Sequence, residues 1–184
     1  MSLTPSSMMP LGTQAPGFTL LDTASGKSLS LSELKSNRAT VILFICNHCP
    51  FVRHIEQQLM TVARTYQTQG VAFIAISAND AVAYPEDAPH RMTEIAREWD
   101  MPFPYLYDET QEVAKAYGAA CTPDLYVFDK ELRCVYRGQF DSSRPGSSIP
   151  VTGKDLSEAL EAILTGNAVN PEQKPSIGCN IKWK

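Results

Sequence analysis

The stretch Thr40-Val41-Ile42-Leu43-Phe44-Ile45-Cys46-Asn47-His48-Cys49-Pro50 decides the fold, because it joins three sequence patterns within a few residues. Residues 40–45 are apolar and rich in β-branched side chains, which predicts a strand covered on both faces of a sheet. From Pro50 onward, apolar residues recur every three or four positions, which predicts an amphipathic helix. Cys46 and Cys49 therefore stand between a buried strand and the first turn of a helix.

The segments on both sides of this stretch indicate an α/β domain with a mixed sheet. A second apolar run at 71–76 follows the helix, so strand, helix and strand form a βαβ unit. Residues 18–21 and 27–31 flank a turn-rich segment and predict an N-terminal β-hairpin. Residues 125–128 and 134–139 predict an antiparallel hairpin. The other expected elements are a short helix at 30–35, a helix from Asp87 as N-cap to Trp99, a strand at 105–107, a helix at 109–117 and a last helix ending at Leu164.

The expected domain spans residues 11–170. Residues 1–10 are rich in Ser, Thr, Pro and Met and lack the basic and apolar regions of a signal peptide, so we expect a flexible tail there. Residues 171–184 contain apolar side chains that a floppy end would not need, which predicts a C-terminal tail packed on the domain or on a partner subunit.

Charge and composition exclude several classes of function. The chain has 184 residues, with 16 Lys and Arg against 20 Asp and Glu, a net charge of -4. Without a basic excess, neither nucleic acid nor a membrane surface is an expected partner. The longest apolar run, residues 41–46, is far shorter than the roughly 20 residues that span a bilayer. Five cysteines do not suggest a disulfide scaffold, so we expect a reducing, cytoplasmic compartment.

The C-x-x-C motif at the predicted helix start indicates redox chemistry. Unpaired N–H groups and the partial positive charge of a helix N-terminus favour a thiolate over a thiol. Two cysteines at this spacing can close a disulfide, so one thiolate can attack a substrate and the other can release the mixed disulfide. A zinc site is the alternative, but the second pair of ligands is missing, because Cys121, Cys134 and Cys179 are isolated in the sequence. We therefore predict dithiol exchange by Cys46 and Cys49, with no cofactor and no metal.

Several motifs along the chain carry a resemblance to a known family. They are Gly12-Thr13-Gln14-Ala15-Pro16-Gly17-Phe18, Phe44 to Val52, Asn79-Asp80 with Tyr84-Pro85-Glu86-Asp87, Cys121-Thr122-Pro123-Asp124 and the segment Pro175 to Lys184. With them the chain resembles the thioredoxin superfamily, and more closely its peroxiredoxin-like branch, related to the alkyl hydroperoxide reductase and thiol-specific antioxidant proteins. The resemblance implies a thioredoxin-like fold, a central mixed sheet flanked by helices. It also implies that Pro123 is a cis-proline facing the C-x-x-C motif and that Thr122 offers backbone groups to a bound thiol partner.

Two departures from the parent patterns bear on activity. Peroxiredoxins carry P-x-x-x-T/S-x-x-C, and counting back from Cys49 places Ile42 at the proline and Cys46 at the hydroxyl position. The hydroxyl that polarises the peroxide is therefore missing. The W-C-G-P-C of thioredoxins is missing too, since Asn47-His48 replaces Gly-Pro.

The residues around the motif receive individual roles. His48 resembles a position in protein disulfide isomerase that stabilises the reduced thiolate and raises the reduction potential; the alternative is an exposed polar residue. We expect Cys46 at the exposed mouth of the helix, with a pKa below that of a free cysteine, and Cys49 a turn deeper and less accessible. Cys121 and Cys179 are candidate resolving thiols, with structural packing as the alternative.

Three functions follow from these patterns. The first is a thiol/disulfide oxidoreductase that acts on protein or small-molecule disulfides and exchanges electrons with protein partners or a cellular reductant. The second is a peroxidase that uses Cys49. The third is a metal-binding or metal-delivery protein that uses the C-x-x-C thiolates. A homodimer is compatible with each of these three functions.

Overall fold

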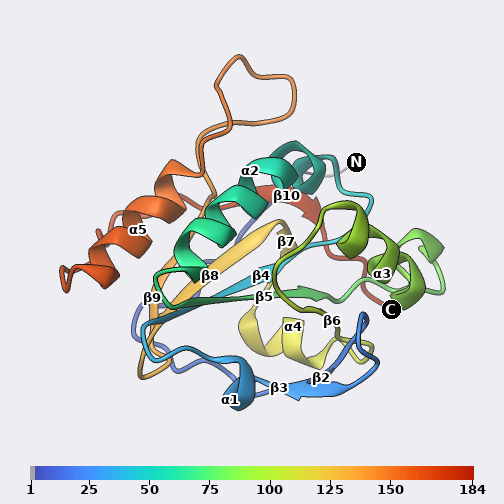
Figure 1. Ribbon diagram of the computed structural model, residues 1–184. Helices are drawn as coiled ribbons and strands as arrows, with labels where there is room; N and C mark the ends of the chain where they lie inside the picture. The colour runs from blue at the N-terminus through green and yellow to red at the C-terminus, as the bar shows by residue number, and fades with distance from the viewer. Residues whose placement is uncertain (1–2) are drawn as a thin grey trace.

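A seven-stranded mixed sheet with strand order β3-β2-β6-β5-β4-β8-β9 organises the computed structural model, which describes residues 3–184 (Figure 1). Its strands are β2 (Thr19–Asp22), β3 (Ser28–Ser30), β4 (Ala39–Phe44), β5 (Val71–Ser77), β6 (Tyr105–Tyr107), β8 (Asp124–Asp129) and β9 (Cys134–Gly138). The central strand β4 pairs in parallel with β5 and antiparallel with β8. The predicted mixed sheet is confirmed, and the N-terminal hairpin β2–β3 extends it by pairing β2 with β6.

Helices cover both faces of the sheet. They are α1 (Leu31–Leu34), α2 (Pro50–Gln67), the 3-10 turn η1 (Pro85–Asp87), α3 (Pro89–Glu98), α4 (Glu112–Tyr117) and α5 (Lys154–Leu164). Along β4, Val41 and Leu43 pack in one hydrophobic cluster with α2, α3 and α5. Ile42 and Phe44 pack in the other with α1 and α4. Because successive strand residues face opposite sides, this three-layer packing explains the unbroken apolar run.

Segments from both ends of the chain form a second sheet beside the first. Its strand order is β1-β10-β7, with β1 at Leu3–Pro5, β10 at Ile177–Asn180 and β7 at Cys121–Thr122. The expectation of a flexible tail at residues 1–10 therefore differs from the structure, where β1 pairs with β10. Met1 and Ser2 lie outside the described residues. The C-terminal segment packs on its own chain, through β7 and β1.

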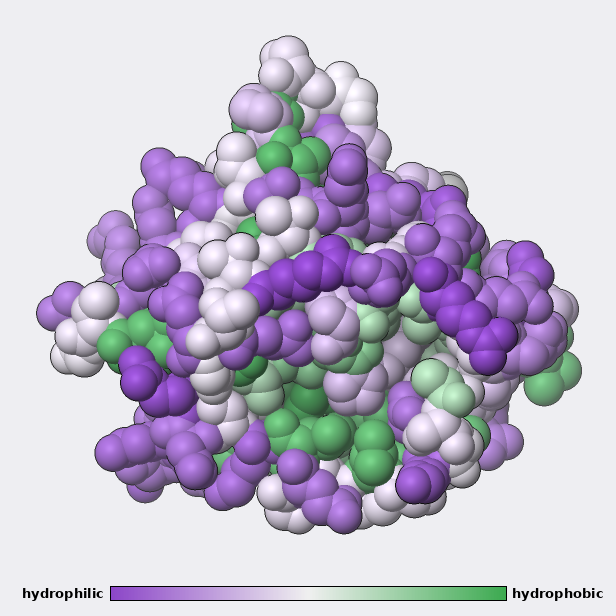
Figure 2. All heavy atoms as spheres, in the orientation of Figure 1, coloured by the Kyte–Doolittle hydropathy of each residue, from purple (hydrophilic) through white to green (hydrophobic). Residues whose placement is uncertain are grey.

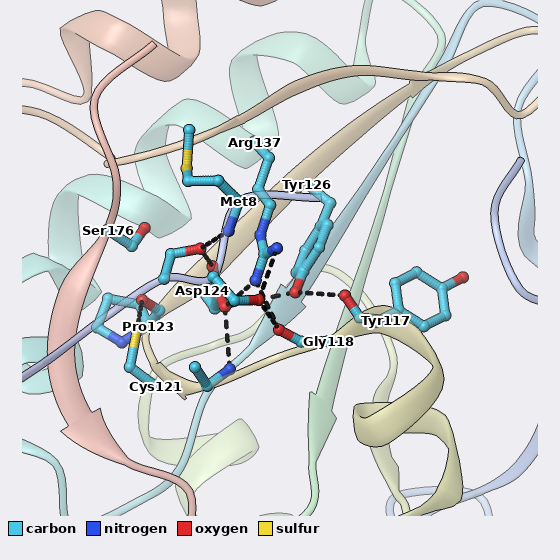
Figure 3. A network of polar contacts seen from close by, with 12 residues as sticks. Met8, Tyr117, Gly118, Cys121, Pro123, Asp124, Tyr126, Arg137 and Ser176 are labelled. Carbon is cyan, nitrogen blue, oxygen red and sulfur yellow. Dashed lines mark hydrogen bonds and ion pairs between the residues drawn. The ribbon is translucent and has the colours of Figure 1, made fainter. Parts of the chain in front are cut away.

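A buried ion pair anchors the junction of β7 and β8, where the Thr122–Pro123 peptide is cis (Figure 3). Asp124 and Arg137 approach to 3.0 Å, with side chains 0% and 1% exposed. The Arg137 guanidinium also donates to the Gly118 carbonyl at 2.8 Å, and the Ser6 hydroxyl donates to Asp124 at 2.9 Å. Burial raises the pKa of Asp124, and Arg137 opposes that shift. The network thus ties the cis peptide to β9 and to the N-terminal segment.

The surface carries few large hydrophobic side chains. In the face shown in Figure 2, hydrophilic residues dominate the periphery and hydrophobic ones gather in the lower middle. The exposed large hydrophobics belong to separate segments of the chain: Leu3, Leu11, Leu21, Val82, Ile149 and Trp183. Among residues 3–184, no helix combines the length and apolar character needed to cross a bilayer. The homodimer remains a prediction.

We expect Arg137→Met to lower the free energy of unfolding by about 3–5 kcal/mol, because it leaves the Asp124 carboxylate buried without its ion pair. Urea unfolding at neutral pH measures the change. Lys154→Met is the matched control, since it breaks the exposed Lys154–Glu158 pair, whose loss changes stability by about 1 kcal/mol or less. Equal losses in the two variants would contradict an anchoring role for the buried pair.

Candidate active site

Cys46 and Cys49 lie where the central strand gives way to the first long helix. Cys46 follows β4, and Cys49 is the N-cap of α2, directly before Pro50. Their sulfurs are in hydrogen-bond contact with each other, so a disulfide can close with little movement. The expectation that Cys46 sits at an exposed mouth is wrong: Cys46 is 1% exposed and Cys49 is 0% exposed. Thr122 covers the pair on one side, and the loop that contains η1 covers it on another.

Protonation of the pair favours Cys49 as the thiolate. The pKa of Cys49 is lowered to about 5, first because the Cys46 thiol donates a hydrogen bond to it, while burial opposes the shift. The Cys179 thiol and the Val52 backbone N–H in the first turn of α2 also lower it. The same hydrogen bond raises the pKa of Cys46, with burial and the Asp87 carboxylate adding to the effect. The predicted lowering of the pKa of Cys46 is therefore wrong, and the lowered pKa belongs to Cys49.

Thr122 contacts both cysteines. Its hydroxyl Oγ1 lies 3.4 Å from Cys46 Sγ, and its carbonyl accepts a hydrogen bond from the Cys49 thiol at 3.0 Å. The carbonyl contact exists only for protonated Cys49, whereas the hydrogen bond of the Thr122 side chain lowers the pKa of Cys49. Thr122 and cis-Pro123 thus stand beside the pair, while their binding of a thiol partner stays a prediction.

His48 forms the outer wall of the site. Its side chain is 23% exposed, its Nδ1 lies 2.7 Å from Asp87 Oδ2, and its ring stacks on Tyr84 at 5.8 Å with an interplanar angle of 8°. Asp87 raises the pKa of His48, burial opposes this, and Glu86 adds a smaller increase. The site therefore favours an imidazolium at this position. A role for His48 in tuning the thiolate remains a prediction.

Asp87 is the site residue that sequence reasoning missed. It was predicted as the N-cap of the following helix, but Ala88 is the N-cap of α3, and the Asp87 side chain is 0% exposed. Its Oδ1 accepts the Asn47 backbone N–H at 2.8 Å, and its Oδ2 accepts a hydrogen bond from Asn79 Nδ2 at 2.7 Å. Asp87 and Asn79 both belong to motifs that carried the family resemblance, which was the available signal for them.

Both polar atoms of the Asn47 side chain form hydrogen bonds. Its Nδ2 donates to the Glu86 carbonyl at 2.8 Å, and its Oδ1 accepts a hydrogen bond from the Tyr105 hydroxyl at 3.1 Å. Tyr105 is 1% exposed and comes from β6. No local pattern links Tyr105 to the motif, so sequence reasoning had no signal for it. These contacts fix the loop between the two cysteines.

The three remaining cysteines differ in their relation to the pair. Cys179 in β10 is in hydrogen-bond contact with Cys49. Cys121 is buried, its thiol lies 3.6 Å from the Pro123 carbonyl, and burial raises its pKa. Cys134 packs in the cluster beneath α1 and α4, where burial raises its pKa to about 11. Of the two candidate resolving thiols, Cys179 is the one for which the structure shows contact with the pair.

Three side chains bring potential metal ligands together, in a set that includes only one of the two C-x-x-C cysteines considered in the sequence analysis. One ligand atom each from Cys46, His48 and Asp87 lies within 4.8 Å of the other two. Thiolate, imidazole and carboxylate donors are the ligand types of zinc sites. The same atoms form the redox site, so metal binding and dithiol exchange would compete.

We expect Asp87→Asn to lower the pKa of His48, because the substitution removes the charge that raises it. The asparagine keeps one side-chain oxygen for the Asn47 N–H, while its amide nitrogen cannot accept the hydrogen bond that Oδ2 accepts from Asn79. The pH dependence of the His48 imidazole signals in NMR measures the shift. The signals of His54, which contacts Ser143 in another loop, serve as the internal reference. An unchanged His48 titration would contradict the ion pair.

Known proteins resemble this chain to different degrees. An uncharacterized conserved protein from Geobacillus kaustophilus, of known crystal structure, is 58% identical and covers 100% of this chain and 97% of its own, with a TM-score of 0.99. The thiol-disulfide oxidoreductase ResA of Bacillus thuringiensis subsp. konkukian is 23% identical over 69% of this chain and 68% of its own length. The chloroplastic peroxiredoxin Q of Populus jackii is 25% identical over 72% of this chain and 62% of its own.

The fold is thioredoxin-like, as the resemblance implied. A putative thioredoxin from Neisseria meningitidis, 20% identical, superimposes with a TM-score of 0.63 over 85% of this chain and 93% of its own. The AhpC/TSA family matches residues 11–137, which include β4, both cysteines, the loop with Asp87 and the cis peptide. The chain therefore belongs to the AhpC/TSA family.

Proposed function

We propose that this protein is a thiol/disulfide oxidoreductase in which Cys46 and Cys49 cycle between dithiol and disulfide. The observation that carries the proposal is the direct contact of the two sulfurs at the start of α2, beside the cis Thr122–Pro123 peptide. The family includes thiol-disulfide oxidoreductases and peroxiredoxins, and both chemistries begin with a thiolate.

The protonation order assigns the steps of exchange. The Cys49 thiolate attacks one sulfur of a partner disulfide, and the other partner sulfur leaves with the electron pair. Cys46 then loses its proton and attacks Cys49 Sγ, which releases the first partner sulfur as a thiolate. The partner is reduced by two electrons, and the chain is left with a Cys46–Cys49 disulfide. A cellular dithiol then reduces the Cys46–Cys49 disulfide by two successive exchanges and is itself oxidised to a disulfide.

His48 and Asp87 support the second step. Asp87 disfavours ionisation of Cys46, and the His48 imidazolium lies near enough to offset that negative charge. Because a nearby cation stabilises a thiolate, His48 would also make the couple more oxidising. In this role His48 is a positioning and tuning residue that acts through the charge it places beside Cys46.

Burial of both sulfurs means that a partner gains access only when part of the site opens. A cleft next to Pro123, lined by Phe51, His54, Phe140 and Ser176 among others, offers a place for a partner to dock. We propose that Pro123 contacts the partner there and that the protein works in a reducing compartment such as the cytoplasm, where its thiols are regenerated.

A peroxidase that uses Cys49 is the second candidate, favoured by the lowered pKa of Cys49. Peroxide reduction also needs groups that polarise the peroxide. Cys46 stands at the position of the hydroxyl, so that polarising group is missing. This arrangement argues for slow reduction of peroxide. Metal binding by Cys46, His48 and Asp87 is a third candidate, favoured by the closeness of their ligand atoms.

We expect the reduced protein to form its first thiolate well below the pKa of about 8.5 of a free cysteine, with Cys49 as the ionising group. Absorbance at 240 nm against pH measures this. Cys46→Ala should raise the pKa of Cys49 more than Cys46→Ser, because serine keeps a hydroxyl donor. Preferential alkylation of Cys46 at pH 6, read by mass spectrometry, would reverse the assignment.

Reduction of insulin disulfides with dithiothreitol as electron donor tests the function itself. Wild type should catalyse the reaction, Cys49→Ser should abolish it because it removes the attacking thiolate, and Cys134→Ser should leave it unchanged because Cys134 lies in the other core cluster. Stopped-flow oxidation by hydrogen peroxide should be slower than oxidation by a model disulfide. Faster oxidation by peroxide would favour the peroxidase, and stoichiometric zinc in protein purified without chelator would favour metal binding.

A further inference from the structure

Strand β10 pairs with the backbone of Thr122, the residue before the cis-proline. Cys179 in β10 pairs with Thr122, and Asn180 pairs with Cys121, in antiparallel register. On its other side β10 pairs with β1. The chain's own strand therefore lies beside the backbone of Thr122, where a thiol partner is expected to bind, and it carries a cysteine.

Gly178 shows how closely this strand is seated. A Cβ atom at this position would lie 2.0 Å from the Thr122 carbonyl oxygen and 2.7 Å from its carbonyl carbon. Only glycine permits this approach of two backbones without a shift. The close contact of β10 with Thr122 thus depends on the residue next to Cys179, and it fixes where the Cys179 side chain can reach.

Cys179 completes a cluster of three sulfurs. It is 2% exposed, and its thiol is in hydrogen-bond contact with Cys49, which also contacts Cys46. The Cys49 sulfur therefore has one thiol neighbour from the C-x-x-C loop and another from β10. Each of these neighbours is placed to form a disulfide with the same central sulfur, subject to the geometric limits of the bond.

We propose that Cys179 is a third redox thiol, which takes over the disulfide from Cys46 by attacking Cys49. The proposal rests on the Cys46–Cys49 cycle proposed above. In this step Cys179 loses its proton and its sulfur bonds to Cys49 Sγ. The Cys46–Cys49 bond breaks, and Cys46 leaves with the electron pair and takes up a proton. One disulfide replaces another, so the step consumes no oxidant or reductant.

The surroundings of Cys179 link its reactivity to the oxidation state of the pair. In the reduced protein its pKa is raised to about 12, first by burial and then by the hydrogen bond and the negative charge of Cys49, while Lys182 opposes these effects. Oxidation of Cys49 to a disulfide removes its charge and its role as a hydrogen-bond acceptor. Oxidation therefore removes the two causes that come from Cys49, while burial still raises the pKa of Cys179.

The transfer of the disulfide to Cys179 changes which segments of the chain are covalently joined at the active site. After it, β10 is covalently joined to the start of α2 across Thr122, and Cys46 is a free thiol beside His48. The protein would then carry a buried Cys49–Cys179 disulfide, while Cys46 is a reduced thiol. A second partner thiol or disulfide could react with Cys46 in that state.

Disulfide mapping of the full-length protein tests the proposal. Reduced protein is oxidised with oxidised glutathione, quenched in acid with N-ethylmaleimide, digested and analysed by mass spectrometry without reduction. In wild type we expect Cys46–Cys49 first and Cys49–Cys179 later. In Cys46→Ser we expect Cys49–Cys179 as the main intramolecular bond. A free Cys179 in oxidised Cys46→Ser overturns the relay, whereas absence of Cys46–Cys49 in wild type overturns the proposed function instead.

A second pair of variants keeps the test valid if Cys46→Ser does not fold. Gly178→Ala should displace β10 from Thr122 and reduce the yield of Cys49–Cys179 several-fold, with Cys46–Cys49 still formed. Gly17→Ala is the matched control, because a Cβ atom at Gly17 meets nothing within 4 Å. Equal yields of Cys49–Cys179 in the two glycine variants would overturn the role assigned to β10.

Discussion

The burial of β4 on both faces is the constraint on which the rest of the structure depends. Its alternating side chains fill two separate hydrophobic clusters, and its backbone pairs with β5 on one side and β8 on the other. A strand held in this way cannot shift register without moving every apolar side chain to the wrong layer. The point where it ends is therefore fixed, and Cys46 and Cys49 follow at that point with α2 packed behind them.

A network of polar side chains around Asp87 shapes the surroundings of the two thiols. Asp87 is fully buried, and a buried carboxylate is stable only with partners that satisfy it. Asn47, Asn79 and His48 are these partners. The Asp87 carboxylate therefore holds together the loop between the cysteines, the segment after β5 and the outer wall of the site. The shape of the thiol environment follows from this requirement as much as from the helix N-terminus.

Patterns in the sequence predicted the strands, helices and hairpins that form through contacts between neighbouring residues. The apolar run before Cys46, the periodicity after Pro50 and the turn chemistry of the hairpins each act over a few residues, and the structure confirms the strands and helices they indicate. Strands β1, β7 and β10 have two to four residues each and no periodicity to detect, so they appear only when distant segments meet. The burial of the thiols could not be predicted for the same reason.

The pKa order of the cysteines shows the same limit at the level of single atoms. A helix N-terminus favours a thiolate nearby, but it does not say which of two adjacent sulfurs receives the hydrogen bonds. That choice depends on Cys179 and Asp87, which reach the pair from opposite sides and from distant parts of the chain. The role of the Asn79 to Asp87 loop likewise follows from contacts that a polar, turn-rich sequence does not reveal.

The order of strands in the small sheet has a consequence for the protein as it is made. Strand β7 and the C-x-x-C loop leave the ribosome well before β10, because β8, β9 and α5 lie between them in the chain. At about 5–20 residues per second, the nascent chain spends several seconds without β10 beside Thr122. During synthesis the site is therefore more open to small thiols and disulfides of the surrounding solution, and its cover is completed only when Gly178 brings the late strand onto Thr122.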